Sequence, residues 1–122
     1  MLLTLHHVQL AMPEGKEDDA IAFYHGILGL PVVEKPDALR HRGGVWFERA
    51  GLRVHLGVEK PFSPARKAHP AFQVASLTTM IAALEAASWP WREDIDLPGL
   101  RRLYVDDPFS KRIELLELSR SG

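Results

Sequence analysis

The sequence has no cysteine, no long hydrophobic run and almost no net charge, and each absence excludes a class of protein. Without cysteine the chain has no disulfide framework, no thiolate metal site and no thiol nucleophile. No apolar run approaches the roughly 20 residues that a membrane-spanning helix needs, and the first residues lack the basic segment of a secretory signal. A formal net charge of −1 gives no general reason to expect nucleic acid or an anionic membrane as a partner. We therefore expect a soluble, cytoplasmic protein with no nucleic-acid or membrane partner.

The order of predicted elements repeats once along the 122 residues. In the first half, hydrophobic periodicity and turn residues predict a strand, a helix and three further strands, at residues 2–12, 16–28, 30–34, 45–49 and 52–59. Residues 37–44 are predicted to form a polar loop, and 60–67 a proline-containing linker. The second half predicts the same order at residues 68–75, 77–87, 89–93, 100–105 and 111–118. The sequence thus predicts an α+β fold of two tandem βαβββ modules, at about 1–60 and 67–118, within a single domain covering 1–122.

Four candidate metal ligands fall on the strand faces opposite the helices. The first and last strand of each module alternate apolar residues with polar ones, and each of these strands contributes one candidate. They are His7, His55, His69 and Glu114. Three imidazoles and one carboxylate suit a single divalent ion such as zinc, nickel, cobalt, iron or manganese. His55 is predicted as the fourth ligand or as a nearby base. Any one histidine taken alone is more often an ordinary surface or core residue, and the four candidates at matching positions are what favour a metal site.

The same alternation predicts the side chains around that ion. If each sheet curls, these faces form two half-cups, with a substrate-binding set of Gln9, Trp46, Arg53, Gln73, Arg102, Tyr104 and Arg112, and with Glu48 beside them. Three guanidinium groups near a metal favour an anionic or oxygen-rich ligand, such as a carboxylate, phosphonate or enediolate. The alternative is that the arginines reach solvent or pair with glutamates. Trp46 either stacks on a flat ligand or fills space.

Several stretches together resemble the vicinal oxygen chelate superfamily, which contains glyoxalase I, extradiol dioxygenases, fosfomycin-resistance enzymes and bleomycin-binding proteins. They cover residues 5–10 (LHHVQL), 22–30 (AFYHGILGL), 69–72 (HPAF) and 104–115 (YVDDPFSKRIEL). The resemblance extends over nearly the whole chain. It implies that paired βαβββ modules form a curved mixed-sheet cup that holds one divalent metal. The family's ligand positions correspond to His7, His55, His69 and Glu114, and we expect Glu114 and His55 to be the catalytic groups.

Three positions depart from the family pattern. The glyoxalase I pattern has glutamate where this chain has His55, which makes plain glyoxalase I activity less favoured. Ser110-Lys111 stands where Gly-Asn is usual. Pro70 follows His69 directly, and because proline has no N–H, the strand there must be an edge strand or locally irregular.

Two functions remain open from the sequence. The first is a metal-dependent enzyme of lyase, isomerase, transferase or dioxygenase type, in which a metal chelates vicinal oxygens of a small anionic substrate and acts as a Lewis acid. The alternative is a metal-free protein that binds and sequesters a small molecule, as bleomycin-resistance proteins do. Modules of about 60 residues expose large apolar edges when separated, so we expect a homodimer, with the cup closed within one chain or across the dimer.

Overall fold

The structure, a computed structural model, describes residues 1–119. The last three residues of the predicted domain lie outside this range. The chain divides between Ser63 and Pro64 into two compact units, each with its own sheet and helix. None of the helices in the described part of the chain is long and apolar enough to cross a membrane.

The first module is a four-stranded mixed sheet with one α-helix and one 3-10 helix. Its elements are β1 (Val8–Met12), α1 (Glu17–Tyr24), β2 (Val32–Val33), η1 (Asp37–Arg42), β3 (Val45–Arg49) and β4 (Leu52–Val58). The strand order is β1-β4-β3-β2. β1 runs parallel to β4, whereas β3 is antiparallel to both β4 and β2.

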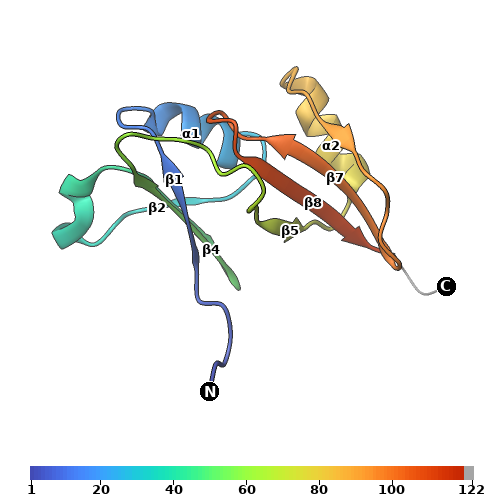
Figure 1. Ribbon diagram of the computed structural model, residues 1–122, viewed down its shortest axis with the longest axis horizontal. Coiled ribbons are helices and arrows are strands. Elements are labelled where there is room, and N and C mark those ends of the chain that lie inside the picture. The colour runs from blue at the N-terminus through green and yellow to red at the C-terminus, as the bar shows by residue number, and fades with distance from the viewer. Residues whose placement is uncertain (120–122) are drawn as a thin grey trace. The chain divides into compact units, whose positions relative to one another are not determined.

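The second module repeats this arrangement. Its elements are β5 (Ala71–Gln73), α2 (Leu77–Ala86), β6 (Arg92–Glu93), β7 (Leu100–Asp106) and β8 (Arg112–Leu118). The strand order is β5-β8-β7-β6, and Figure 1 shows β7 and β8 as its two long neighbouring arrows. β5 is parallel to β8, and the other pairs are antiparallel. The two βαβββ modules and the α+β class predicted from the sequence are therefore confirmed.

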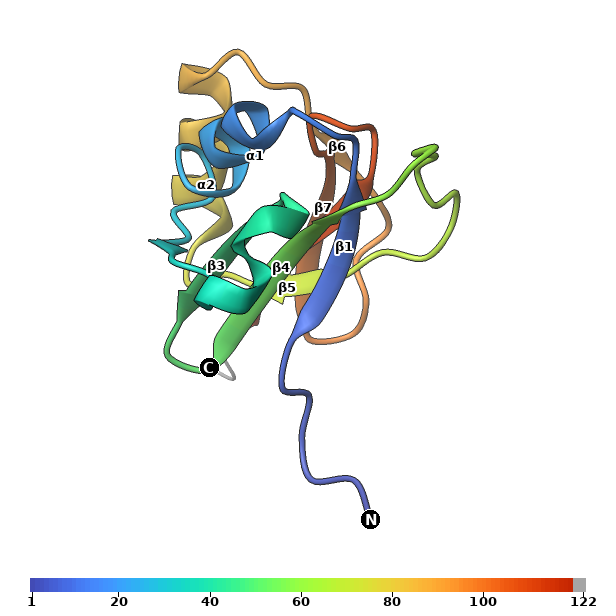
Figure 2. The ribbon, with the colours of Figure 1, turned by 90° about the vertical axis from the view of Figure 1, so that its left-hand side faces the viewer.

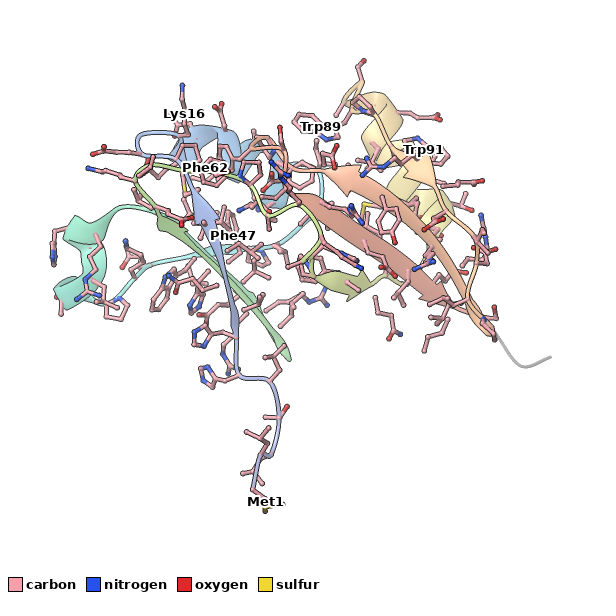
Figure 3. The ribbon with its side chains drawn as sticks, viewed as in Figure 1. Met1, Lys16, Phe47, Phe62, Trp89 and Trp91 are labelled. Carbon is pink, nitrogen blue, oxygen red and sulfur yellow. The ribbon has the colours of Figure 1, made fainter. Side chains whose placement is uncertain are left out.

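In each module the helix covers one face of the sheet and buries its apolar residues. α1 packs on β3, where the Tyr24 and Phe47 rings lie 5.5 Å apart and both side chains are fully buried; Phe47 is labelled in Figure 3. α2 packs on β8, with Leu84 and Leu115 buried. Burying a leucine or phenylalanine side chain stabilises a fold by roughly 1.5–3 kcal/mol. These contacts hold each helix on one face and leave the opposite face of the sheet to polar residues.

The second helix begins with two independent caps. Ser76 Oγ accepts a hydrogen bond from the Thr79 amide at 3.1 Å, as its type and position predict. Glu117 of β8 accepts one from the Leu77 amide at 2.7 Å. Glu117 therefore has a structural role at the start of α2.

The first strand of each module is shorter than predicted. β1 begins at Val8 instead of residue 2, because its pairing with β4 begins at Val8 and Val54. β5 begins at Ala71, after Pro70, whose carbonyl accepts from the Glu114 amide at 3.0 Å. β5 is an edge strand, as the proline requires. His7 and His69 consequently lie just before their strands instead of within them.

Residues 37–44 do not form a plain polar loop as predicted. Residues Asp37–Arg42 form the 3-10 helix η1, which ends at two glycines with positive φ, Gly43 and Gly44. The α-helix predicted over 16–28 ends as such at Tyr24, and the chain continues through hydrogen-bonded turns to Gly29, which has a φ of +80°.

Candidate metal and substrate site

Strand register places the predicted polar residues of the first module in one row. Gln9 lies opposite His55, and His55 lies opposite Trp46, on the face that α1 does not cover. Glu48 and Arg53 are opposite each other on the same face. Cross-strand neighbours on one face are close enough for their side chains to interact. The first module therefore collects an amide, an indole, an imidazole, a carboxylate and a guanidinium on one open surface.

His55 is held at the centre of a stack of rings. Its ring is parallel to Trp46 with centroids 3.8 Å apart, and His7 stacks against it at 4.8 Å. His55 is buried, whereas His7 is exposed. The structure thus brings together the two candidate ligands of the first module, although they are distant in sequence.

Glu48, which is predicted to face the cup but has no predicted role in the site, contacts His55. Its Oε2 lies 2.7 Å from Nε2 of His55. An ionised carboxylate only accepts hydrogen bonds, so Nε2 carries the proton and Nδ1 of a neutral ring keeps its lone pair. Arg53 lies 3.9 Å from the other Glu48 oxygen and donates to the His6 carbonyl. The signal was present in the sequence, because Glu48 has the same strand parity as Trp46.

The second module joins its own two candidate ligands. Nε2 of His69 lies 3.0 Å from Oε1 of Glu114, and its Nδ1 lies 2.8 Å from the Lys67 carbonyl oxygen. Glu114 is buried within β8, next to Ala71 of β5 and Tyr104 of β7 in the strand register. Arg102 approaches the other Glu114 oxygen at 3.7 Å.

Three guanidinium groups surround the Tyr104 ring. The Cζ atoms of Arg112, Arg92 and Arg102 lie 5.3, 5.6 and 5.7 Å from the ring centroid. Arg92 forms a two-point ion pair with Asp106, at 3.2 Å for each contact, and Arg112 donates to the Arg66 carbonyl. Among residues 1–119, Arg112 forms no ion pair with a carboxylate. Of the predicted second-module set, only Gln73 stands apart, exposed at the end of β5.

Asp94, in the loop before β7, holds the Arg102 side chain in position. The Ile95 amide donates to the Asp94 carboxylate at 2.7 Å, and this bond, followed by the charge of Arg102, holds the pKa of Asp94 below its usual value. Arg102 also donates to the Ile95 carbonyl at 2.9 Å. These contacts fix the guanidinium beside Tyr104 and Glu114.

The chemistry of the donor atoms fits a divalent metal, although each module alone offers only part of a coordination sphere. Within residues 1–119, no three His, Asp, Glu or Cys side chains gather into a metal-binding group. Each module presents a pair, His7 with His55 and His69 with Glu114. Imidazole nitrogen and carboxylate oxygen are the ligands that borderline divalent metals prefer. In both modules a candidate ligand histidine has one ring nitrogen held by an oxygen acceptor, the arrangement that orients histidines toward metals.

Comparison with known proteins identifies relatives among solved structures. No protein-family model matches the chain, and no curated protein matches it. A protein assigned to the glyoxalase family from Bacillus anthracis is 39% identical over 98% of each chain, with a TM-score of 0.93. Lactoylglutathione lyase from Agrobacterium tumefaciens is 21% identical over 93% of this chain and 92% of its own, with a TM-score of 0.72. TnmS3, an antibiotic binding protein from Streptomyces sp. CB03234, is 17% identical over 98% of this chain and 100% of its own, with a TM-score of 0.73.

The likenesses to the lyase and to TnmS3 show a shared fold alone. The likeness to the Bacillus anthracis protein also shows the family, because 39% identity extends over nearly the full length of both chains. It agrees with the paired βαβββ modules and with the sequence resemblance at 5–10, 22–30, 69–72 and 104–115. This chain therefore belongs to the glyoxalase family, within the vicinal oxygen chelate superfamily.

Proposed function

We propose that this protein is a metal-dependent enzyme in which a divalent ion binds neighbouring oxygens of a small anionic substrate. The proposed ligands are His7, His55, His69 and Glu114, two from each module. The observation that supports this most directly is the geometry of His69, whose Nε2 is 3.0 Å from Glu114 while its Nδ1 is 2.8 Å from a backbone carbonyl.

The His69 geometry leaves two chemical possibilities. A carbonyl oxygen only accepts, so Nδ1 must carry a proton. Nε2 then either carries a second proton, which makes an imidazolium–carboxylate ion pair, or holds a lone pair beside the Glu114 carboxylate. A lone pair facing a carboxylate oxygen is stable only with a proton or a metal cation between them, and Glu114 is buried, which makes an uncompensated charge costly. A divalent metal satisfies both groups.

Side chains of the protein have proposed roles in binding the substrate and in moving its proton. A divalent ion would supply Lewis-acid stabilisation of the oxyanion that forms on the substrate. Arg102 and Arg112, arranged around Tyr104, would bind the anionic group. His55 directs Nε2–H at Glu48, which fixes its tautomer and leaves Nδ1 free as a ligand or a base, as a carboxylate does for the histidine of a catalytic triad. Gln9, Trp46, Arg53 and Gln73 complete the proposed substrate-binding set.

The histidine–carboxylate pair in the first module favours lyase or isomerase chemistry within the wider range of lyase, isomerase, transferase and dioxygenase reactions. Those two reaction types need a group that removes a proton from the substrate, and His55 with Glu48 is such a group. The proposed metal is zinc, nickel, cobalt, iron or manganese, and the experiment below identifies which of them binds. We further propose that the protein is a cytoplasmic homodimer.

The test is metal analysis of protein purified without an affinity tag, followed by titration of each ion. We expect stoichiometric uptake of one of the five ions. Glu114→Gln should weaken binding by at least about 100-fold, since even the outer hydrogen-bond partners of a metal ligand typically contribute 10–100-fold. Glu117→Gln is the matched control on the same strand, because glutamine retains the acceptor for the Leu77 amide.

Failure of the wild-type protein to take up any of these ions would refute the enzyme proposal. It would favour the alternative, a metal-free protein that sequesters a small molecule, which is the kind of role that TnmS3 has by its description as an antibiotic binding protein. Equal binding by Glu114→Gln and Glu117→Gln would instead contradict the assignment of Glu114 as a ligand.

A further inference from the structure

A cavity of about 280 Å³ lies in the first module, between η1 and the polar face of the sheet. Its walls come from five segments: Gln9 of β1, Lys35 before η1, Leu39 and Arg42 of η1, Trp46 of β3, and residues 56–58 of β4. Figure 2 shows η1 in front of β3 and β4. The cavity therefore belongs to this module alone and needs no residue of the second.

Two glycines shape the cavity. Gly44 has a φ of +86°, and a Cβ at this position would collide with the Leu56 carbonyl oxygen, so only glycine lets the chain leave η1 this close to β4. Gly57 faces the cavity from β4 without a side chain, and a Cβ there would come within 2.6 Å of the Gln9 amide nitrogen. The space is thus made by the backbone and does not depend on a chance gap between side chains.

The charged side chains that line the cavity, Lys35 and Arg42, are both cations. Among residues 1–119, neither of them forms an ion pair, and Lys35 donates to the Gly43 carbonyl. Their neighbour Arg40, which does not line the cavity, pairs with both Glu34 and Asp37 at 3.2 Å. The unpaired cations on η1 and beside it are therefore those that line the cavity.

The cavity also offers a flat aromatic surface and an amide. Trp46 is half-buried, and its ring is fixed by stacking on His55 at 3.8 Å with an interplanar angle of 2°. The Gln9 side chain carries both donors and an acceptor. An immobilised indole binds planar groups with little further loss of side-chain freedom.

We propose that this cavity binds a small ligand that combines one planar ring with one anionic group, a carboxylate or a phosphonate. The ring stacks on Trp46, and the anion lies between Lys35 and Arg42. The volume is just below the roughly 300–1,000 Å³ range of ligand sites, which limits the ligand to about one ring and its acid group. This binding shares Gln9 and Trp46 with the proposed substrate-binding set, but it requires neither a metal nor the second module, so it can be tested without them.

The probe is phenylphosphonate, titrated calorimetrically into the full chain after treatment with a chelator. We expect saturable binding, with benzamide, a planar neutral compound of similar size, at least about tenfold weaker. Arg42→Gln and Lys35→Met should each weaken phenylphosphonate binding about tenfold or more, since a hydrogen bond to a charged group contributes roughly 1.5–3 kcal/mol. Arg40→Gln, which removes a cation from the same 3-10 helix outside the cavity, should leave the affinity unchanged.

Arg112→Gln distinguishes this cavity from the arginines around Tyr104. Loss of phenylphosphonate binding in Arg112→Gln, with full binding in Arg42→Gln, would overturn the proposal and assign the anion to the second module. Equal affinity of wild-type protein, Arg42→Gln and Lys35→Met would overturn it as well, as would the absence of any binding at millimolar probe.

Discussion

Ser110 holds a backbone conformation that favours glycine, at a position where the family pattern has glycine. Its φ is +66° in the turn between β7 and β8. The turn is organised by Asp107, whose buried carboxylate accepts from the Phe109 and Lys111 amides at 2.9 and 2.8 Å. The Ser110 amide also donates to the Asp107 carbonyl oxygen at 3.1 Å. The serine is tolerated because Asp107 and backbone amides define the turn. The same turn directs the chain into β8, and so sets the position of Glu114.

Replacing this serine should stabilise the protein. We expect Ser110→Gly to raise the free energy of unfolding by about 1 kcal/mol, because a left-handed conformation costs a non-glycine residue roughly 1–2 kcal/mol and glycine loses part of that gain to chain entropy. Denaturant titration measures the change. Ser63→Gly, in the linker and without a positive φ, should not stabilise. A Ser110→Gly variant no more stable than wild type would show that the turn is not strained.

At the scale of elements, the 3-10 helix η1 forms one wall of the cavity in the first module. It connects β2 to β3 and turns back onto β4 through Gly43 and Gly44, and the Gly44 amide donates to Glu17 of α1 at 3.4 Å. Polar composition predicts only a loop for this segment. The helix forms because Gly44 allows a close approach to β4, and the result is a wall over Trp46.

Gly44 and Gly51 of the first module provide a matched pair of substitutions. Gly44 and Gly51 have similar φ values, +86° and +78°, but a Cβ at Gly44 would meet the Leu56 carbonyl whereas a Cβ at Gly51 would have nothing within 4 Å. We expect Gly51→Ala to lower stability by roughly 1 kcal/mol and Gly44→Ala to lower it by a further 1–3 kcal/mol, the usual effect of overpacking. Thermal unfolding compares them. Equal losses of stability in the two variants would mean that η1 shifts to accommodate the added Cβ without a further loss of stability.

At the scale of the whole molecule, the first residues stand out because they are apolar and exposed. Leu2, Leu3 and Leu5 have relative exposures of 100, 96 and 80%, and Figure 1 shows this segment leading away from β1. Consecutive exposed leucines are unfavourable in water and are typical of a contact with a partner. The segment leads directly to His7, so a partner that covers it would also approach the proposed metal ligands. These features support the proposed homodimer.

A dimer of this kind predicts a particular behaviour in sedimentation equilibrium. Wild-type protein should sediment at about twice the chain mass of 13.7 kDa, and Leu3→Asp should shift it toward monomer, because a charge replaces apolar surface in the contact. Ile95→Asp is the control, since Ile95 is 81% exposed but lies far from the segment in sequence. A monomeric wild-type protein would contradict the homodimer proposal, and equal dissociation in both variants would exclude the segment from the contact.

The sequence by itself determined the element order and the faces of the strands. Both depend on local properties: the period of two in a strand places Gln9, Trp46 and His55 on one side, whichever strands later pair. Strand lengths were less predictable, because β1 and β5 pair with their parallel partners only from Val8 and from Ala71 onward. Membership of the glyoxalase family was likewise visible in short stretches of sequence.

The tertiary structure alone decided which of those polar residues meet. Glu48 reaches His55 because the register of the β3–β4 pair sets them near each other. His69 reaches Glu114 because the approach to β5 brings together two segments that are distant in sequence. The cavity over Trp46 arises in the same way, from a loop that folds onto a strand through Gly44. Local alternation specifies a face, but a site requires distances between side chains, and those are set by packing between elements that the chain joins only on folding.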